Sequence, residues 1–342
     1  MKSNPKKIAL VTGACGFVGS HMVDLLVAKG YKVRATDLET ADSKYLNKSK
    51  NVEFVPADVT KKEELPPLFE GVGKVFHTAA ILKFRVPWEL LYNVNVMGTK
   101  NICEVALDSG IEHMIVWSSE TVYGKTGKSA ADETKFFSPL GKYEKSKALQ
   151  DRLAMDFYKK KGLPVTIIRP AAIYGPRSKS GVSPLIFLMS DVQFFAIPGK
   201  KDVKGALVHV QDIVNAAYFL SGKKKTIGQM YNVNDDKSSV YTKKELLLYA
   251  SKLLNKKLYT FSIPMFLIYF FAEMLELLGE VIKRDSNIEK GFVKYLADDY
   301  VMDNSKIKKL GYKFIYPDTK AGFKDTIDWF EKEGWITIRN SK

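Results

Sequence analysis

The segment Tyr143-Glu-Lys-Ser-Lys147 places a phenol and an amine four residues apart within a predicted helix over residues 140–161. Residues four apart on a helix share a face, so both side chains would point into one site. A free tyrosine titrates near pH ~10, and a neighbouring ammonium favours the phenolate and lowers its pKa. Tyr143 would then exchange a proton with an alcohol or carbonyl, with Lys147 as its tuner and the Ser119 hydroxyl bound to the same substrate oxygen.

These residues must be positioned by elements that alternate along the chain. A short apolar run typical of a buried parallel strand occurs at 8–11, and further strands are predicted at 31–36, 52–56, 74–78, 113–117 and 165–168. Helices are predicted between them, at about 17–29, 61–70, 88–109 and 140–161. Ser119 follows the fifth strand, and the Tyr–Lys helix comes next. This alternation predicts an α/β fold with a doubly wound parallel sheet.

A glycine-rich turn, Thr12-Gly-Ala-Cys-Gly-Phe-Val-Gly19, follows the first strand. Gly13 permits a tight turn, Gly16 leaves room for a pyrophosphate, and Gly19 lets the helix pack close to the sheet. The N–H groups and the dipole at the helix start would hold the phosphates. The second strand leads into Asp37, whose carboxylate would accept hydrogen bonds from an adenosine ribose and repel a 2′-phosphate. The pattern predicts a Rossmann unit that binds NAD in preference to NADP.

After about residue 175 the alternation loosens, and proline and glycine become frequent. A strand at 206–210, a helix at 211–220, a strand at 230–233 and a helix at 241–254 are predicted there. We therefore expect residues 1–175 to form the Rossmann NAD-binding core, with 206–234 returning to it. Residues 176–205 and 235–342 would form a small α/β C-terminal lobe that binds the substrate.

The 342 residues carry a net charge of +15 with a pI of about 9.4, and lysines cluster at 159–161 and 223–225. We interpret this excess as a solvated surface, with attraction to anionic lipid or another polyanion as the alternative. No aromatic-basic motif accompanies the charge, so no nucleic-acid partner is predicted.

The two cysteines, Cys15 and Cys103, have neither the pattern of a disulfide framework nor the spacing of metal ligands. No metal site is predicted. The first seven residues are polar and basic and lack the apolar core of a signal peptide, which predicts a cytoplasmic protein.

Seven motifs, in order over about residues 7–335, resemble those of the extended short-chain dehydrogenases/reductases, also called the NAD-dependent epimerase/dehydratase superfamily. They are Thr12–Gly19, Asp58-Val59, His77-Thr-Ala-Ala80, Asn93–Thr99, Ser118–Gly124, Tyr143-x-x-x-Lys147 and Arg169–Pro176. The resemblance also implies a homodimer through the helices that begin near Trp88 and Leu140. Tyr123 and Tyr174 are alternatives to Tyr143, but their motif positions imply packing beside the site.

The resemblance assigns a further set of residues to the dinucleotide. These are Phe17 and Val18 over the pyrophosphate, Asp37 at the adenosine ribose, Asp58 and Val59 beside the adenine, Ala79 and Ala80 in the cleft wall, Lys147 at the nicotinamide ribose, Pro170 next to the nicotinamide, and Tyr143 itself. The positive charge of an oxidised nicotinamide would help Lys147 to favour the Tyr143 phenolate.

Departures from the family pattern concern the substrate. Nucleotide-sugar epimerases and dehydratases usually have an asparagine where this chain has Ala172, and a phosphate-binding arginine where it has Gly205. Lys204 would replace that arginine only as a point charge. The segment before Asp303 also lacks a second arginine. An anionic sugar nucleotide would therefore find few binding groups.

Apolar stretches are present instead. Residues 184–189 and 194–197 would line or cover the substrate cleft, and 261–272 is the most hydrophobic run in the chain. That run is shorter than the ~20 residues that span a bilayer. It would form a buried helix of the small lobe, a lid over the cleft, or an interfacial helix in peripheral membrane contact. These features resemble the 3β-hydroxysteroid dehydrogenase-like branch, which acts on secondary alcohols of sterol-like or other hydrophobic substrates.

We therefore predict an NAD(P)-dependent oxidoreductase that acts on a secondary alcohol or ketone of a hydrophobic, steroid- or lipid-like small molecule. The alternative is a nucleotide-sugar 4-epimerase or related sugar-modifying enzyme, which makes a transient 4-keto sugar and reduces it again. A non-catalytic NAD-sensing scaffold is disfavoured because Tyr143, Lys147 and Ser119 are all present.

Overall fold

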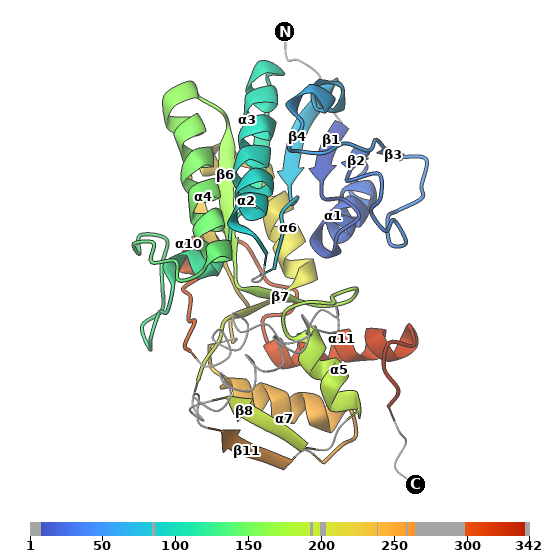
Figure 1. The fold of residues 1–342 in the computed structure, drawn as a ribbon, viewed down its shortest axis with the longest axis vertical. Coiled ribbons are helices and arrows are strands. Elements are labelled where there is room, and N and C mark those ends of the chain that lie inside the picture. The colour runs from blue at the N-terminus through green and yellow to red at the C-terminus, as the bar shows by residue number, and fades with distance from the viewer. Residues whose placement is uncertain are drawn as a thin grey trace.

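The computed structural model describes residues 8–83, 86–191, 194–198, 203–237, 239–257, 259–263 and 298–338. The larger part is a layered α/β unit, and a smaller lobe lies beyond the carboxyl ends of its strands (Figure 1). This arrangement places the junction of the two parts next to the loops that follow the strands.

The main sheet has seven strands in the order β10-β6-β5-β4-β1-β2-β3, all parallel. Their bounds are β1 Ile8–Thr12, β2 Lys32–Thr36, β3 Val52–Phe54, β4 Val72–His77, β5 His113–Trp117, β6 Val165–Pro170 and β10 Met230–Val233. The strand order reverses between β1 and β4, and in such sheets ligands bind at the carboxyl ends at this point. The predicted doubly wound parallel α/β fold is confirmed.

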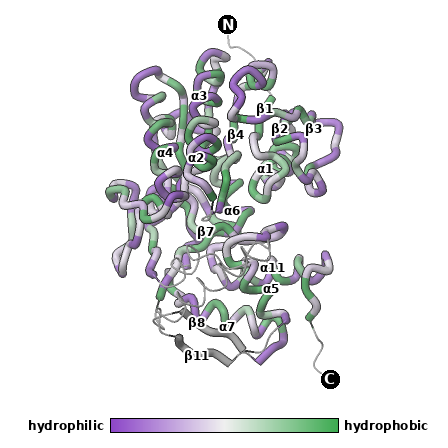
Figure 2. The backbone as a smooth tube through the Cα atoms, in the orientation of Figure 1, coloured by the Kyte–Doolittle hydropathy of each residue, from purple (hydrophilic) through white to green (hydrophobic). Residues whose placement is uncertain are grey.

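Helices cover both faces of this sheet. Helices α1 (Phe17–Ala28) and α6 (Val210–Ser221) pack against each other on one face, and α3 (Thr99–Asp108) and α4 (Lys142–Lys161) pack together on the other. Each face buries its own apolar core, and the outer turns of the helices are hydrophilic (Figure 2). The central strands β1, β5 and β6 are almost wholly buried because both of their faces are covered, whereas the edge strand β3 has no buried residue.

The prediction of a single helix over 88–109 is wrong, because the structure interrupts it between residues 92 and 98. The chain forms α2 (Trp88–Leu91), then a π-helical turn over Tyr92–Gly98, and then α3. Asn95 is buried in that turn, and its side chain accepts the N–H of Ile81 at 2.8 Å. A π-helical turn inserts an extra residue and rotates the side chains, a local change that a helical hydrophobic pattern does not reveal.

The helix predicted over 61–70 is also wrong. It is two 3-10 turns, Lys62–Glu64 and Pro66–Phe69. Pro66 and Pro67 lack the N–H groups that an α-helix would need there. The strand predicted over 52–56 ends at Phe54, before Pro56.

In the residues that the structure describes, the smaller lobe contains two short parallel sheets and three larger helices. Its strands are β7 (Ala172–Tyr174) with β9 (Leu207–His209), and β8 (Phe194–Pro198) with β11 (Tyr259–Ile263). Its helices are α5 (Ser183–Asp191), α7 (Lys243–Leu253) and α11 (Thr319–Lys332), while the short α10 (Ser305–Lys309) contacts β10 of the main sheet. An apolar core joins α5, α7 and α11.

Two predictions for this lobe need correction. Residues 184–189 do not simply line the cleft, because Leu185, Ile186 and Met189 are buried in the core of the lobe and only Pro184 faces the cleft. The run 261–272 begins in strand β11, so it is not one helix. The remainder of that run lies outside the described residues. Among the helices that the structure describes, none is both long and apolar enough to cross a membrane.

Candidate active site

A cleft of about 920 Å³ opens at the carboxyl ends of the strands, where the strand order reverses. All the residues assigned to catalysis or cofactor binding from the sequence line it: Gly13, Gly16, Phe17, Val18, Gly19, Asp37, Asp58, Val59, Ala79, Ala80, Ser119, Tyr143, Lys147 and Pro170. The structure therefore brings together residues that are up to 157 positions apart. Their individual roles stay predictions.

The glycine turn is built so closely that side chains do not fit. A Cβ at Gly13, where φ is +67°, would lie 2.8 Å from the backbone of Ala79, and one at Gly19 would lie 2.0 Å from the carbonyl oxygen of Gly13. Helix α1 begins after Gly16, which makes no side-chain capping bond. The first N–H groups of α1 therefore have no side-chain acceptor at the cap and face the cleft, the arrangement that binds phosphates.

Asp37 stands at the end of β2, and its carboxylate is oriented by the backbone. One oxygen accepts the N–H of Cys15 at 3.0 Å, and the other accepts the N–H of Leu38 at 2.9 Å. A carboxylate has about four acceptor sites, so it can still accept ribose hydroxyls. Asp58 is held in a tight turn, because one of its oxygens accepts both the N–H and the hydroxyl of Thr60.

Tyr143 and Ser119 meet in the cleft through a hydrogen bond between their side chains. Ser119 caps the 3-10 turn Glu120–Tyr123, and its hydroxyl lies 2.9 Å from that of Thr121. Burial raises the pKa of the Tyr143 phenol, and the Ser119 hydrogen bond opposes that rise. The phenol is therefore protonated at neutral pH.

Lys147 and the charge of an oxidised nicotinamide are together predicted to lower the pKa of Tyr143, and this role stays a prediction. The ammonium of Lys147 donates to the carbonyl of Trp117 at 2.5 Å and to the side-chain oxygen of Gln150. Burial lowers the pKa of Lys147 to about 7, while the nearby Asp151 opposes that shift. Burial thus disfavours the charged form of both groups, and the positive charge of an oxidised nicotinamide would favour the phenolate.

A buried chain of polar side chains holds Lys147, and the sequence did not reveal it. Gln150 donates to the hydroxyl of Thr99 at 2.8 Å, and that hydroxyl lies 2.8 Å from His77. The other ring nitrogen of His77 lies 2.7 Å from Thr12, the last residue of β1. The pKa of His77 falls to about 3, chiefly through burial and secondly through the charge of Lys147. The spacing of Lys147 and Gln150, three residues apart on α4, is the one signal that would have found this contact.

Glu120 is a second residue that the sequence analysis missed. It is 2% exposed and lines the cleft directly after Ser119. Its carboxylate accepts the N–H of Ala172 at 3.0 Å, which joins the catalytic turn to β7.

The position of the missing arginine is filled from another element. A Cβ at Gly205 would lie 2.5 Å from Cε of Lys243, at the start of α7. Lys243 donates to the carbonyl of Asp298 at 2.7 Å. The absence of a side chain at 205 thus admits a lysine from α7.

Tyr123 and Tyr174 pack beside the site, as predicted. The hydroxyl of Tyr123 donates to Asn232 at 2.8 Å and accepts from Arg169, and the hydroxyl of Tyr174 donates to Asp235 at 2.8 Å. Arg169 forms a buried ion pair of 2.8 Å with Asp151, which ties β6 to α4 below Lys147. In the part of the chain that the structure describes, no group of three or more histidine, cysteine or acidic side chains is placed to hold a metal.

Comparison with protein families gives a match over residues 9–234 to the model of the NAD dependent epimerase/dehydratase family. The chain belongs to this family. The predicted resemblance to extended short-chain dehydrogenases/reductases is thereby confirmed, and NAD is the cofactor. The glycine turn, the free start of α1 and the oriented Asp37 are the residues that would hold it.

Two curated relatives are enzymes named for sterol substrates, in agreement with the predicted resemblance to the 3β-hydroxysteroid dehydrogenase-like branch. Sterol-4-alpha-carboxylate 3-dehydrogenase, decarboxylating, from Bos taurus is 32% identical over 67% of this chain, and the match spans 65% of that enzyme. Sterol demethylase protein B from Methylococcus capsulatus is 28% identical over 96% of this chain and 99% of its own length.

Among solved structures, the UDP-glucose 4-epimerase of Thermus thermophilus in complex with NAD superposes with a TM-score of 0.74, at 22% identity over 95% of this chain and 99% of that one. At this identity the likeness shows the fold alone.

Proposed function

We propose that this protein is an NAD-dependent dehydrogenase or reductase that acts on a secondary alcohol or ketone of a hydrophobic, sterol-like molecule. The observation that carries the proposal is the hydrogen-bonded Tyr143–Ser119 pair, set beside Lys147 in the same cleft as the glycine turn. The sterol-acting relatives support the substrate class.

In this proposal the side chains of Ser119 and Tyr143 have different roles in the reaction. Ser119 and Tyr143 bind the reacting oxygen and hold it at one place in the cleft. The protonated phenol of Tyr143 donates its proton to a carbonyl oxygen in the direction of reduction. In the direction of oxidation the phenolate accepts the alcohol proton, and positive charge in the cleft favours that form. Bound NAD supplies the hydride acceptor.

The substrate half of the cleft is walled mainly by apolar residues, which include Ile81, Leu82, Leu90, Ile173 and Pro184. Such a wall suits a hydrocarbon ring system, since burial of apolar surface stabilises binding by about 25 cal/mol per Å². Among the cleft-lining residues that the structure describes, none is an arginine that could bind a pyrophosphate with two hydrogen bonds.

The test is a screen for NADH formation at 340 nm with 3β-hydroxysteroids, 4α-carboxylated 3β-hydroxysteroids, lipid alcohols and UDP-sugars. NADH from a steroid alcohol, abolished in Tyr143→Phe, is the expected result. Because oxidation beside a carboxylate gives a β-keto acid, release of CO₂ from the carboxylated steroid is measured in parallel. No turnover of any hydrophobic alcohol would refute the proposal.

A nucleotide-sugar 4-epimerase is the second candidate, favoured by the polar side chains of Ser119, Glu120 and Thr121 in the cleft. Interconversion of UDP-sugar epimers without net NADH would identify this activity.

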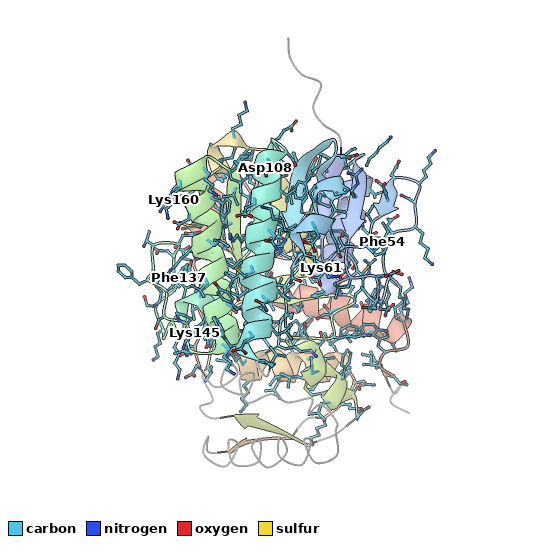
Figure 3. All side chains as sticks on the ribbon, turned by 45° about the horizontal axis from the view of Figure 1, so that its top comes forward. Phe54, Lys61, Asp108, Phe137, Lys145 and Lys160 are labelled. Atoms are coloured by element: carbon cyan, nitrogen blue, oxygen red, sulfur yellow. The ribbon has the colours of Figure 1, made fainter. Side chains whose placement is uncertain are left out.

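A homodimer, a cytoplasmic location and peripheral membrane contact are also proposals. Exposed apolar side chains at Tyr92 and Leu149 support the dimer, because they lie on the π-helical turn and on α4, which contact each other. Figure 3 shows α3 and α4 side by side on this face of the molecule. Analytical ultracentrifugation with and without Leu149→Glu tests the dimer.

A further inference from the structure

A row of four buried polar side chains connects the glycine turn with Lys147, and the proposed chemistry assigns it no role. The row consists of Thr12, His77, Thr99 and Gln150, and each of these side chains hydrogen-bonds the next. None of the four is exposed to solvent. Their polar atoms must therefore find partners within the protein, and the pattern of donors and acceptors limits how each group is oriented.

The hydroxyl of Thr99 fixes the direction of the hydrogen bonds in this polar row. It donates to the carbonyl of Asn95 at 2.8 Å, so its oxygen accepts from both His77 and Gln150. The Nε2 atom of His77 then carries the proton, and Nδ1 accepts from the hydroxyl of Thr12. Burial lowers the pKa of His77 to about 3, so the ring is neutral and holds only this one proton. Every hydroxyl and ring N–H of the row thus has an acceptor, which makes the row a fixed support.

This arrangement also orients Gln150 toward Lys147. The amide nitrogen of Gln150 donates to Thr99 at 2.8 Å, so the amide oxygen faces the ammonium and accepts from it. The carbonyl of Trp117 accepts a second N–H of the ammonium at 2.5 Å. Among the residues that the structure describes, these are the two acceptors of Lys147, which is 2% exposed and lines the cleft. The third N–H is left for a ligand in the cleft.

The charge of Lys147 depends on these acceptors. Burial lowers the pKa of Lys147 to about 7, and Asp151 opposes the shift. Both oxygens of Asp151, however, accept from the guanidinium of Arg169, at 2.8 and 3.0 Å. The other titratable neighbours, Tyr143 one turn earlier on α4 and the neutral His77, add no negative charge at neutral pH. Since hydrogen bonds to a charged group favour the charged form, the two oxygens on the ammonium oppose the effect of burial.

We propose that Gln150 is a positioning residue, which keeps Lys147 protonated and directs its free N–H into the cleft. Thr99 and His77 act one step further away, because they hold the amide of Gln150 in the orientation that presents its oxygen. This inference deepens the proposed function. It rests on that function for the action of Lys147 beside Tyr143, but the hydrogen bonds of the polar row do not depend on the substrate.

The test follows the ionisation of Lys147 itself. The protein is labelled with ¹³C at the lysine Cε atoms, saturated with NAD⁺ and titrated with pH by nuclear magnetic resonance. Tyr143→Phe is the background, so that the phenol does not titrate together with the lysine. The Lys147 signal is the one that disappears in Lys147→Met. Two variants are compared in this background: Gln150→Met, which removes both polar atoms at similar volume, and Gln150→Glu, which keeps an acceptor oxygen and adds a negative charge.

Gln150→Met should lower the titration midpoint of Lys147 by about 1–2 pH units, the equivalent of one hydrogen bond to a charged group. Gln150→Glu should raise it. Thr99→Val should lower it less, because the Gln150 oxygen remains but loses its anchor. Thr166→Val is the matched control, because Thr166 is also buried and lies 2.8 Å from a histidine ring, that of His113, but does not line the cleft. It should leave the midpoint unchanged.

A midpoint that Gln150→Met leaves in place, shifts of Gln150→Met and Gln150→Glu in the same direction, or an equal shift in Thr166→Val would overturn the inference. NADH formation is measured separately with the wild-type protein. If it makes NADH from a hydrophobic alcohol and the midpoint does not move in Gln150→Met, the inference fails and the proposed function stands. If the midpoint moves as expected and no alcohol yields NADH, the proposed function fails and the assignment of Gln150 stands.

Discussion

The two halves of the cleft are built in different ways. The cofactor half is shaped by backbone and by missing side chains, as at Gly13 and Gly19, where a Cβ would collide with main-chain atoms. The substrate half is shaped by side chains from distant segments, since Glu120 contacts β7 and Lys243 reaches past Gly205 from α7. The cofactor half thus depends on the backbone conformation of one short motif. The substrate half depends on contacts between several elements, such as β7 and α7.

This difference explains which half a sequence reveals. The glycines that leave room for the cofactor lie within the eight consecutive residues Thr12–Gly19, so a sequence motif reveals them. A charge pair such as Glu120 and Lys243 spans more than a hundred positions, and neither residue belongs to a recognisable pattern with the other. Four substitutions, each with its own measurement, test this difference between the two halves.

The largest effect is expected where the halves meet, at Tyr143. Tyr143→Phe should lower kcat by about 10²–10⁴-fold because the proton donor is lost. NAD affinity should be retained, since the glycine turn and Asp37 are untouched. Steady-state kinetics and NADH fluorescence titration measure the two quantities separately. Activity within about tenfold of wild type would assign proton transfer to another group.

Gly19→Ala tests the backbone-built half. The new Cβ would lie 2.0 Å from the Gly13 carbonyl oxygen, so α1 must move away from the turn. We expect NAD affinity to fall at least about tenfold and stability to fall by about 1–3 kcal/mol, the usual cost of overpacking. Calorimetry and thermal unfolding measure these changes.

Gly222→Ala is the matched control for this substitution. Gly222 has an ordinary φ of −87°, and a Cβ there would be 3.7 Å from the nearest heavy atom. It should bind NAD as wild type does. Unchanged affinity in Gly19→Ala would show that the close approach of α1 to the turn is not required.

The same contrast accounts for the accuracy of the fold prediction. The parallel strands were predictable because burial on both faces leaves continuous apolar runs, as in Ile8–Thr12 and His113–Trp117. The π-helical turn at Tyr92–Gly98 was not, because the hydrophobic pattern of a helix does not reveal it; the structure shows it together with a tertiary contact, in which Asn95 accepts the N–H of Ile81. The orientation of Lys147 toward Gln150 was missed for a similar reason: a shared helix face shows which side chains are neighbours but not which one a buried ammonium contacts.

Asp37→Asn should change cofactor choice with a smaller effect. Removing the negative charge lessens repulsion of a 2′-phosphate, so the preference for NAD over NADP should fall by about tenfold. The measurement is the ratio of kcat/KM for the two cofactors. Asp58→Asn is the control, because the Asp58 carboxylate is engaged by Thr60 and is expected to lie beside the adenine. An equal change in both variants would remove Asp37 from its assigned place at the ribose.

Lys243→Met is expected to have the smallest effect. It tests how much stability the protein loses by burying the Lys243 charge in the substrate half of the cleft. The pKa of Lys243 is about 7 in the folded protein against an ordinary value of 10.5. Between these values the unfolded chain holds a proton that the folded chain has released, so wild-type stability rises with pH across this window. Below pH 7 both states are protonated, and the penalty for the buried charge is present in full.

Methionine has no titrating group, so the variant lacks this contribution. The melting temperature of Lys243→Met relative to wild type should therefore be highest near pH 6 and should fall toward pH 9. Lys147, which has a similar pKa, is present in both proteins and cancels in the difference. A difference that stays constant with pH would mean that Lys243 is not held as a desolvated charge. The contrast between the two halves would then be one of geometry alone, without an electrostatic cost on the substrate side.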